Sequence, residues 1–202
     1  VPPPIPVTFP EGLRREDMAR ILEEKSDLSG QEYLDATGPG PEGADRAGTK
    51  DARSLEGFLF PATYEIGTET TVAFLVERQL AAYDDAVAGV DMRFAKSRNL
   101  TPYDVLTIAS MVEREVAEPS ERPLVAGVIY NRLRLKMRLD IDATVQYAVG
   151  EWRQLTAADL RSDSPYNTRK FPGLPPGPIA SPGLASIKAA AVEERVVEQL
   201  AD

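Results

Sequence analysis

The stretch SPYNTRKFPGLPPGPIASPG (Ser164–Gly183) places the strongest restriction on the fold of this 202-residue chain. Its six prolines and three glycines exclude a helix, because proline lacks an amide donor and clashes with the preceding turn. The same missing donors exclude a central strand. The segment therefore predicts a long ordered loop in which proline fixes many of the φ angles.

Polar and aromatic side chains within this loop indicate one wall of a binding site. Tyr166, Asn167, Thr168, Arg169 and Phe171 can hydrogen-bond to a polar ligand or stack on it. The alternative is an ordered loop that crosses the surface and binds nothing.

The composition fits one globular domain and a smaller module, with 43% hydrophobic and 27% charged residues. No segment approaches the ~18 uninterrupted apolar residues of a membrane span. The chain begins at Val1 rather than Met. This start predicts a fragment or a processed form, with any membrane anchor upstream of it.

Charge and missing residue types exclude several functions. A formal charge of −9, from 32 acidic and 23 basic residues, disfavours nucleic-acid binding and docking on an anionic membrane. The chain has no His and no Cys, which excludes a Ser-His-Asp triad, a cysteine nucleophile and a thiolate or imidazole zinc site. Enzyme chemistry would therefore depend on carboxylates, acting as acids and bases or as ligands of a hard cation.

The first third of the chain predicts a small module followed by a linker. Residues Val1–Pro10 suggest a short edge strand, a helix is expected over 14–24, and Ser29 can cap a second short helix. The alternative is that these elements pack on the main domain. The polar, Gly- and Pro-rich segment Gly38–Arg53 predicts a mobile linker.

The clearest helix begins at Thr101 and runs to near Pro119. Thr101 can cap it, Pro102 fits the first helical position, and Asp104 completes a capping box. Elsewhere we expect a buried extended segment over 55–66 and helices over 71–88, 120–133 and 142–149.

Two carboxylates near the end of that helix are candidate acids. At about 100° per residue, Glu113 falls inside the apolar stripe and Glu115 at its other edge. A carboxyl group among aliphatic side chains is desolvated, which favours the protonated form that a general acid needs. The alternative is that Glu113 pairs with Arg132 or Arg134 at the surface. Spacing alone does not exclude Glu115.

Other polar residues could assist such an acid. Glu56 and Asp142 are each a possible second carboxylate, although Asp142 is most simply the N-cap of the helix that follows it. Asn131 could orient a carboxyl group or a sugar hydroxyl, or it could cap a loop. The residues alone leave these alternatives open.

Five segments in this order carry a resemblance to a known family. They are LEGFLFPATY (55–64), ASMVEREV (109–116), ERPLVAGVIYNRL (121–133), MRLDIDATVQYAVG (137–150) and SPYNTRKFPGLPPGPIASPGLASIKAA (164–190). Together they resemble the YceG-like family, the endolytic murein transglycosylases of bacteria. The N-terminal VTFPEGLRREDMARILEEK (7–25) resembles the LysM-like module of that family.

The resemblance implies a fold and a domain organisation. The expected class is α+β, with a LysM-like module over 1–37, a linker over 38–53 and a larger, mostly helical catalytic domain over 54–202. The chain departs from the family pattern at Arg169, where members usually have Tyr, and at Ser181, where they usually have Asn. The charged end VEERVVEQLAD (192–202) replaces an expected strand-forming segment with His, which predicts a truncated or altered C-terminus.

The resemblance also implies an activity. Family members cleave the bond between N-acetylmuramic acid (MurNAc) and N-acetylglucosamine (GlcNAc) and leave 1,6-anhydroMurNAc ends. The catalytic glutamate of the family falls on Glu113, as general acid and then base, with no metal or organic cofactor. The expected substrate-binding residues are Glu56, Asn131, Asp142, Thr144, Tyr166, Asn167 and Thr168.

The implied partners are peptidoglycan glycan strands and proteins of cell-wall synthesis. The implied location is the extracytoplasmic face of the bacterial cell membrane, held there by a single-pass anchor. Two other functions remain open. One is a non-catalytic peptidoglycan-binding scaffold. The other is a muramidase-type hydrolase that uses Glu113 with Glu56 or Asp142 and leaves a reducing end.

Overall fold

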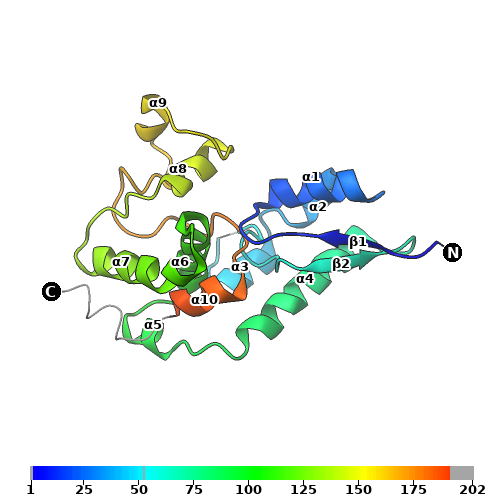
Figure 1. Ribbon diagram of the computed structural model, residues 1–202, viewed down its shortest axis with the longest axis horizontal. Coiled ribbons are helices and arrows are strands. Elements are labelled where there is room, and N and C mark those ends of the chain that lie inside the picture. Colours follow the sequence, from blue (N-terminus) through cyan, green and yellow to red (C-terminus); the bar gives the residue numbers. More distant parts are fainter. Residues whose placement is uncertain (1, 52, 192–202) are drawn as a thin grey trace. The chain divides into compact units, whose positions relative to one another are not determined.

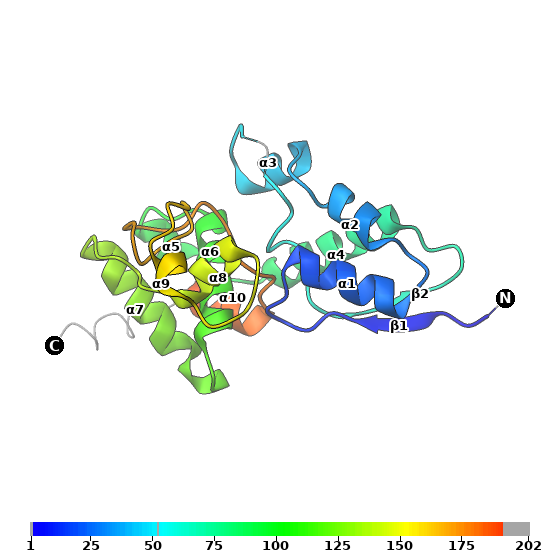
Figure 2. The ribbon, with the colours of Figure 1, turned by 90° about the horizontal axis from the view of Figure 1, so that it is seen from above.

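The computed structural model describes residues 2–51 and 53–191, in two units (Figures 1 and 2). The first unit contains residues 1–89 and 180–183, and the second contains 90–179 and the chain from 184 onward. The described residues are mostly helical with one small sheet, an α+β arrangement as predicted. No described helix is both long and apolar enough to span a membrane.

The first unit is a two-stranded antiparallel sheet with helices packed around it (Figure 1). Strand β1 pairs with β2 so that Val7 lies opposite Tyr64, and both side chains are buried. The elements are β1 (Ile5–Thr8), α1 (Arg15–Lys25), α2 (Gly30–Ala36), α3 (Pro41–Ala47), β2 (Thr63–Ile66) and α4 (Val72–Val87).

The core of this unit lies where α1, α2 and α4 meet. Met18, Leu22 and Tyr33 are fully buried there, and the Tyr33 hydroxyl donates to the side-chain oxygen of Gln79 at 2.9 Å. Ser29 caps α2 by accepting a hydrogen bond from the Glu32 amide, as its sequence position predicts.

The segment predicted as a linker contains a helix. Pro41 starts α3, and Gly48 ends it in the left-handed conformation at φ 66°. Gly43 packs so closely that a Cβ atom there would lie 2.0 Å from the Arg53 carbonyl oxygen. Because β1 pairs with β2, residues 54–89 belong to the same unit as the N-terminus, whereas the sequence suggested a boundary before residue 54. The LysM-like assignment of 1–37 stays a prediction.

The second unit is built around the helix α6. It is buried from Val105 to Val112 and packs against α7, α8 and α10 (Figure 1). The elements are α5 (Arg93–Ser97), α6 (Pro102–Glu115), the 3-10 turn η1 (Pro119–Glu121), α7 (Arg122–Arg134), α8 (Asp142–Val149), α9 (Ala157–Leu160) and α10 (Leu184–Ala190).

The predicted capping box of α6 is present. The Thr101 hydroxyl accepts from the Asp104 amide at 3.1 Å, and the Asp104 carboxylate accepts from the Thr101 amide at 2.8 Å. The segment Ser164–Gly183 forms neither a helix nor a strand, as its prolines require. The predicted change at residues 192–202 lies outside the described residues.

Candidate active site

Glu113 lies on the last turn of α6 with its side chain only 8% exposed. Its Oε1 accepts a hydrogen bond from Arg122 Nη2 at 3.4 Å. The sequence suggested Arg132 or Arg134 as the alternative partner. Instead Arg132 donates to the Leu139 carbonyl, and Arg122 reaches Glu113 from the first residue of α7.

A buried hydroxyl holds Arg122 in place. Arg122 Nε donates to Ser186 Oγ at 2.9 Å, and Ser186, on α10, is fully buried. Side chains from three helices are therefore linked in series, from Glu113 on α6 through Arg122 on α7 to Ser186 on α10. Neither Arg122 nor Ser186 was predicted as a site residue. The one sequence signal was the short connection that places Arg122 nine residues after Glu113.

Glu115 belongs to a different polar cluster. Glu115 is exposed as a whole residue, but its carboxyl group is partly buried beside α8, where it accepts a hydrogen bond from the Ala143 backbone. Desolvation of the carboxyl raises its pKa, and the neighbouring Asp142 raises it further, while the Ala143 hydrogen bond and the cation of Arg169 act in the opposite direction.

Thr144 and Thr168 fasten the Pro-rich loop to α8. Both are buried, and their hydroxyl oxygens lie 2.9 Å apart. The Thr168 hydroxyl also accepts from the Ile141 amide at 3.1 Å, and the Thr144 hydroxyl donates to the Ile141 carbonyl at 2.8 Å. These two predicted substrate-binding hydroxyls therefore have internal partners.

Asn167 is likewise used inside the loop. It is fully buried, and its Nδ2 donates to the carbonyls of Leu160 at 3.0 Å and Ser162 at 2.9 Å. Its Oδ1 accepts from the Arg169 amide at 3.1 Å. Tyr166 is partly exposed, and its ring packs on Tyr147 with centroids 4.8 Å apart. Within this motif, Tyr166 is the side chain best placed to meet a ligand.

Asp142 is the first helical residue of α8, and the N-cap position falls on Ile141. The prediction that Asp142 is the N-cap is therefore wrong by one residue. Its carboxylate instead accepts a hydrogen bond from Arg169 Nε. Arg169 thus partly neutralises the Asp142 carboxylate at the start of α8.

The Pro-rich loop runs along α6. The Ile179 amide donates to Ser110 Oγ at 3.0 Å. Gly177 packs so closely that a Cβ atom there would lie 2.2 Å from the Tyr103 hydroxyl. The Pro-rich loop and α6 are therefore in contact, although they are far apart along the chain. The predicted groove between Glu113 and residues 166–178 stays a prediction.

The remaining predicted residues have distinct surroundings. Asn131, on α7, has a buried Oδ1 with no hydrogen-bond partner among the described residues. Glu56 belongs to the first unit, where it is 3% exposed and its Oε2 accepts from the Arg15 amide at 3.4 Å. Within residues 2–51 and 53–191, no cluster of three or more acidic side chains could hold a metal ion.

Comparison with known proteins decides the family. The model of the YceG-like family matches residues 2–196. The chain belongs to the YceG-like family. A crystal structure of a YceG-like protein from Listeria monocytogenes superimposes with a TM-score of 0.81 at 32% identity, covering 95% of this chain and 67% of that one.

Two curated relatives of this YceG-like chain are named endolytic murein transglycosylase. The protein from Streptococcus pneumoniae R6 is 45% identical over 140 residues, and that from Bacillus subtilis is 40% identical over 138 residues. The matches cover 66% and 67% of this chain. The chain spans only 25% and 38% of the length of these two relatives.

The raised pKa of Glu115 predicts a pH-dependent contribution to stability. A carboxyl group whose pKa is raised on folding contributes stability below its usual pKa of 4.5, and this is lost as the pH rises through the folded-state value. Glu115→Gln cannot ionise. Its thermal unfolding temperature relative to wild type should therefore rise modestly from pH 4.5 towards neutrality, since the residue is exposed. A relative decrease over this range would contradict the prediction.

Proposed function

We propose that this YceG-like chain cleaves the MurNAc–GlcNAc bond of peptidoglycan strands and leaves 1,6-anhydroMurNAc ends. The observation that carries the proposal is the buried carboxylate of Glu113, held by Arg122 where α6, α7 and α10 meet. The names of the relatives, at 40–45% identity, support the same activity.

Glu113 supplies the proton for bond cleavage. In its protonated state it donates to the glycosidic oxygen, and the bond between this oxygen and C1 of MurNAc breaks towards an oxocarbenium-like state. The resulting carboxylate then accepts the proton of the MurNAc C6 hydroxyl, whose oxygen bonds to C1. The proton count balances, because Glu113 gives one proton and regains one.

One carboxylate is sufficient for this reaction. Hydrolases of glycosides generally need a second carboxylate, as nucleophile or to activate water. Here the nucleophile belongs to the sugar being cleaved, and its high effective concentration replaces that second group. This agrees with the surroundings of Glu115 and Asp142, whose carboxylates are engaged at the start of α8 by Ala143 and Arg169.

Arg122 acts as a positioning residue for Glu113. Its hydrogen bond to Glu113 Oε1 at 3.4 Å fixes the orientation of the carboxyl group. Two further acceptors hold the Arg122 guanidinium group in this position. Ser186 Oγ at 2.9 Å and the Pro119 carbonyl at 3.5 Å are available to it.

Tyr166 offers an aromatic face to a sugar ring. Its packing on Tyr147 restricts its orientation, and the internal hydrogen bonds of Asn167 and Thr168 fix the backbone beside it. The polymer lies outside the cytoplasmic membrane, so the activity places the chain there. Anchoring by a single-pass helix and contacts with cell-wall synthesis proteins belong to the same proposal.

Mass spectrometry of digested peptidoglycan tests the proposed reaction. Strands incubated with this chain should yield fragments that end in 1,6-anhydroMurNAc, each one water lighter than the product of hydrolysis. Fragments with reducing ends would identify a muramidase-type hydrolase instead. Strands that are bound but remain intact would identify a non-catalytic scaffold.

A further inference from the structure

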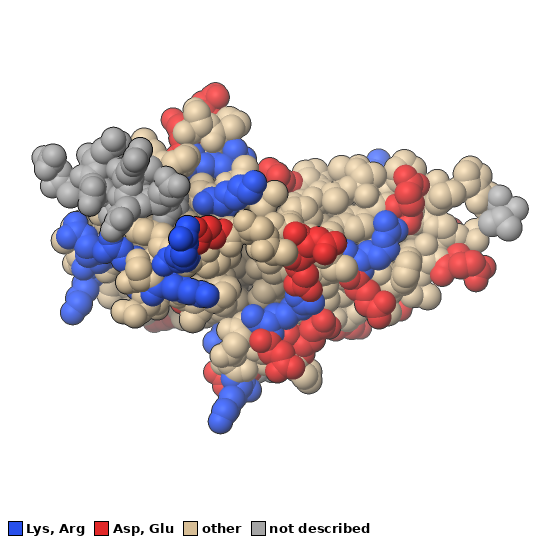
Figure 3. All heavy atoms as spheres, turned by 90° about the horizontal axis from the view of Figure 1, so that it is seen from below, with Lys and Arg blue, Asp and Glu red and all other residues tan. Residues whose placement is uncertain are grey.

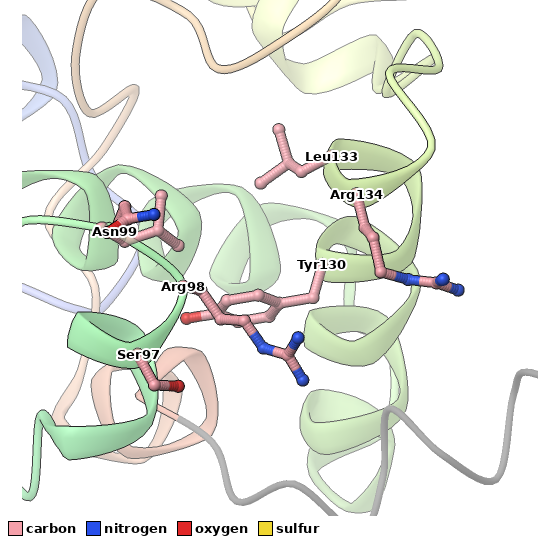
Figure 4. A pocket seen from close by; sticks show the side chains of 7 residues that line it. Ser97, Arg98, Asn99, Tyr130, Leu133 and Arg134 are labelled. Carbon is pink, nitrogen blue, oxygen red and sulfur yellow. The ribbon is translucent and has the colours of Figure 1, made fainter.

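A cavity of about 430 Å³ opens between the C-terminal ends of α5 and α7 in the second unit (Figure 4). It contains none of the residues assigned to the proposed reaction. Its described lining residues are Ser97, Arg98, Asn99, Leu100, Tyr130, Leu133 and Arg134.

Among the described residues, the two arginines of the cavity have no carboxylate partner. Neither Arg98 nor Arg134 forms an ion pair with any residue that the structure describes, and no acidic residue is among the described lining. Arg122, Arg153 and Arg169 of the same unit each pair with a carboxylate. Two guanidinium groups at one cavity suit an anion that can accept several hydrogen bonds.

The walls of the cavity are preformed. Tyr130 is 5% exposed, its hydroxyl donates to the Ala190 carbonyl at 2.7 Å, and its ring meets the Phe94 ring edge-to-face at 5.1 Å. The Arg98 guanidinium lies 5.2 Å from the Phe94 ring centre, and Figure 4 shows it beside Tyr130. The Arg98 guanidinium therefore packs on the Phe94 ring, which is itself held by its contact with Tyr130.

The other lining residues indicate which chemical group carries the anionic charge. Asn99 has a left-handed backbone with φ 59°, and its amide can donate a further hydrogen bond. Leu100 and Leu133 add apolar surface. Donors beside aliphatic side chains fit a carboxylate that carries a small alkyl group better than a fully hydrated inorganic anion.

The charge of the chain is unevenly distributed between its two halves. Residues 1–89 contain 17 acidic and 8 basic residues, which accounts for the whole formal charge of −9. Residues 90–202 contain 15 acidic and 15 basic residues, a balance of zero. Figure 3 shows Lys and Arg gathered over the second unit on the face drawn there. The unit that holds the cavity therefore does not repel an anionic ligand.

We propose that this cavity binds the terminal carboxylate of a short peptide. Arg98, beside Tyr130, pairs with the carboxylate, and the Asn99 amide donates to it. Arg134, whose side chain extends away from Tyr130 in Figure 4, adds a second positive charge at the rim, and Leu100 and Leu133 contact the neighbouring alkyl side chain. This inference rests on the proposed function, since a peptidoglycan strand carries short peptides that end in carboxylates next to methyl groups.

Calorimetric titration with N-acetyl-D-alanyl-D-alanine tests the site. We expect the dipeptide to bind and its C-terminal amide to bind about tenfold more weakly or worse, because the amide removes the charge-assisted hydrogen bonds. Arg98→Gln and Arg134→Gln should each raise the Kd about tenfold. Lys96→Gln is the matched control, since Lys96 is an exposed cation of α5 outside the cavity, and its Kd should be unchanged.

Several outcomes would overturn the inference. These are absence of dipeptide binding, equal binding of the amide, equal binding of inorganic phosphate, and a Kd that neither arginine substitution changes. Thermal unfolding of each variant shows that the fold is kept, as expected for exposed side chains. The titration involves no cleavage, so a failure of the proposed reaction and a failure of this site would be seen separately.

Discussion

Glu113→Gln is expected to lower the rate of strand cleavage by about 10²-fold or more, the usual scale of a positioned proton transfer. The amide can neither give nor take the proton at the glycosidic oxygen. It is nearly isosteric, and its oxygen can still accept from Arg122, so the helix packing around it should persist. The measurement is the initial rate of soluble fragment release, with thermal unfolding as the check on the fold.

Glu115→Gln is the matched control for this prediction. It makes the same chemical change two residues further along α6, at a carboxylate that is engaged by Ala143. We expect its cleavage rate to stay close to that of wild type, and strand binding to survive in both variants. If Glu115→Gln abolished cleavage and Glu113→Gln did not, the catalytic role would pass to Glu115.

Asn167→Ala is expected to lower the free energy of unfolding by about 3 kcal/mol, because three internal hydrogen bonds are lost and two carbonyls lose a donor. The carbonyls are those of Leu160 and Ser162, and the third bond is the one from the Arg169 amide. Denaturant unfolding measures the change. Cleavage should fall as well, since Tyr166 would lose its fixed backbone.

Asn131→Ala provides the comparison for stability. The buried Asn131 Oδ1 has no partner among the described residues, so its removal should change stability little. An Asn167→Ala variant with unchanged stability but weakened strand binding would show that Asn167 contacts the substrate, as the sequence predicted.

The sequence predicts the scaffold of the candidate site well because the signals are local. Thr101, Pro102 and Asp104 mark the start of α6 within four residues, and the capping box is present. The periodicity of α6 also predicts that Glu113 is buried, since a helix with one apolar face must turn that face inward. The periodicity of α6 could not identify the hydrogen-bond partner of Glu113, because Arg122 belongs to the next helix, α7.

Long-range hydrogen bonds leave no periodic trace in a sequence. Thr144 and Thr168 are 24 residues apart and hydrogen-bond to each other. A threonine hydroxyl can hydrogen-bond to a substrate hydroxyl or to a backbone amide equally well. Residue type therefore does not distinguish a substrate-binding threonine from a structural one. The predicted linker shows a different limit. Its Gly and Pro suggested a loop, although Pro41 and Gly48 are also helix start and stop signals.

Digestion of peptidoglycan strands in heavy-oxygen water tests whether the C6 hydroxyl or water is the nucleophile. The MurNAc ends released by this chain should contain no heavy oxygen, because the C6 hydroxyl of the same sugar closes the ring. Glu113→Gln should release almost none of these ends. Incorporation of one heavy oxygen at each new end would show that water is the nucleophile, and would contradict the proposed transglycosylase reaction.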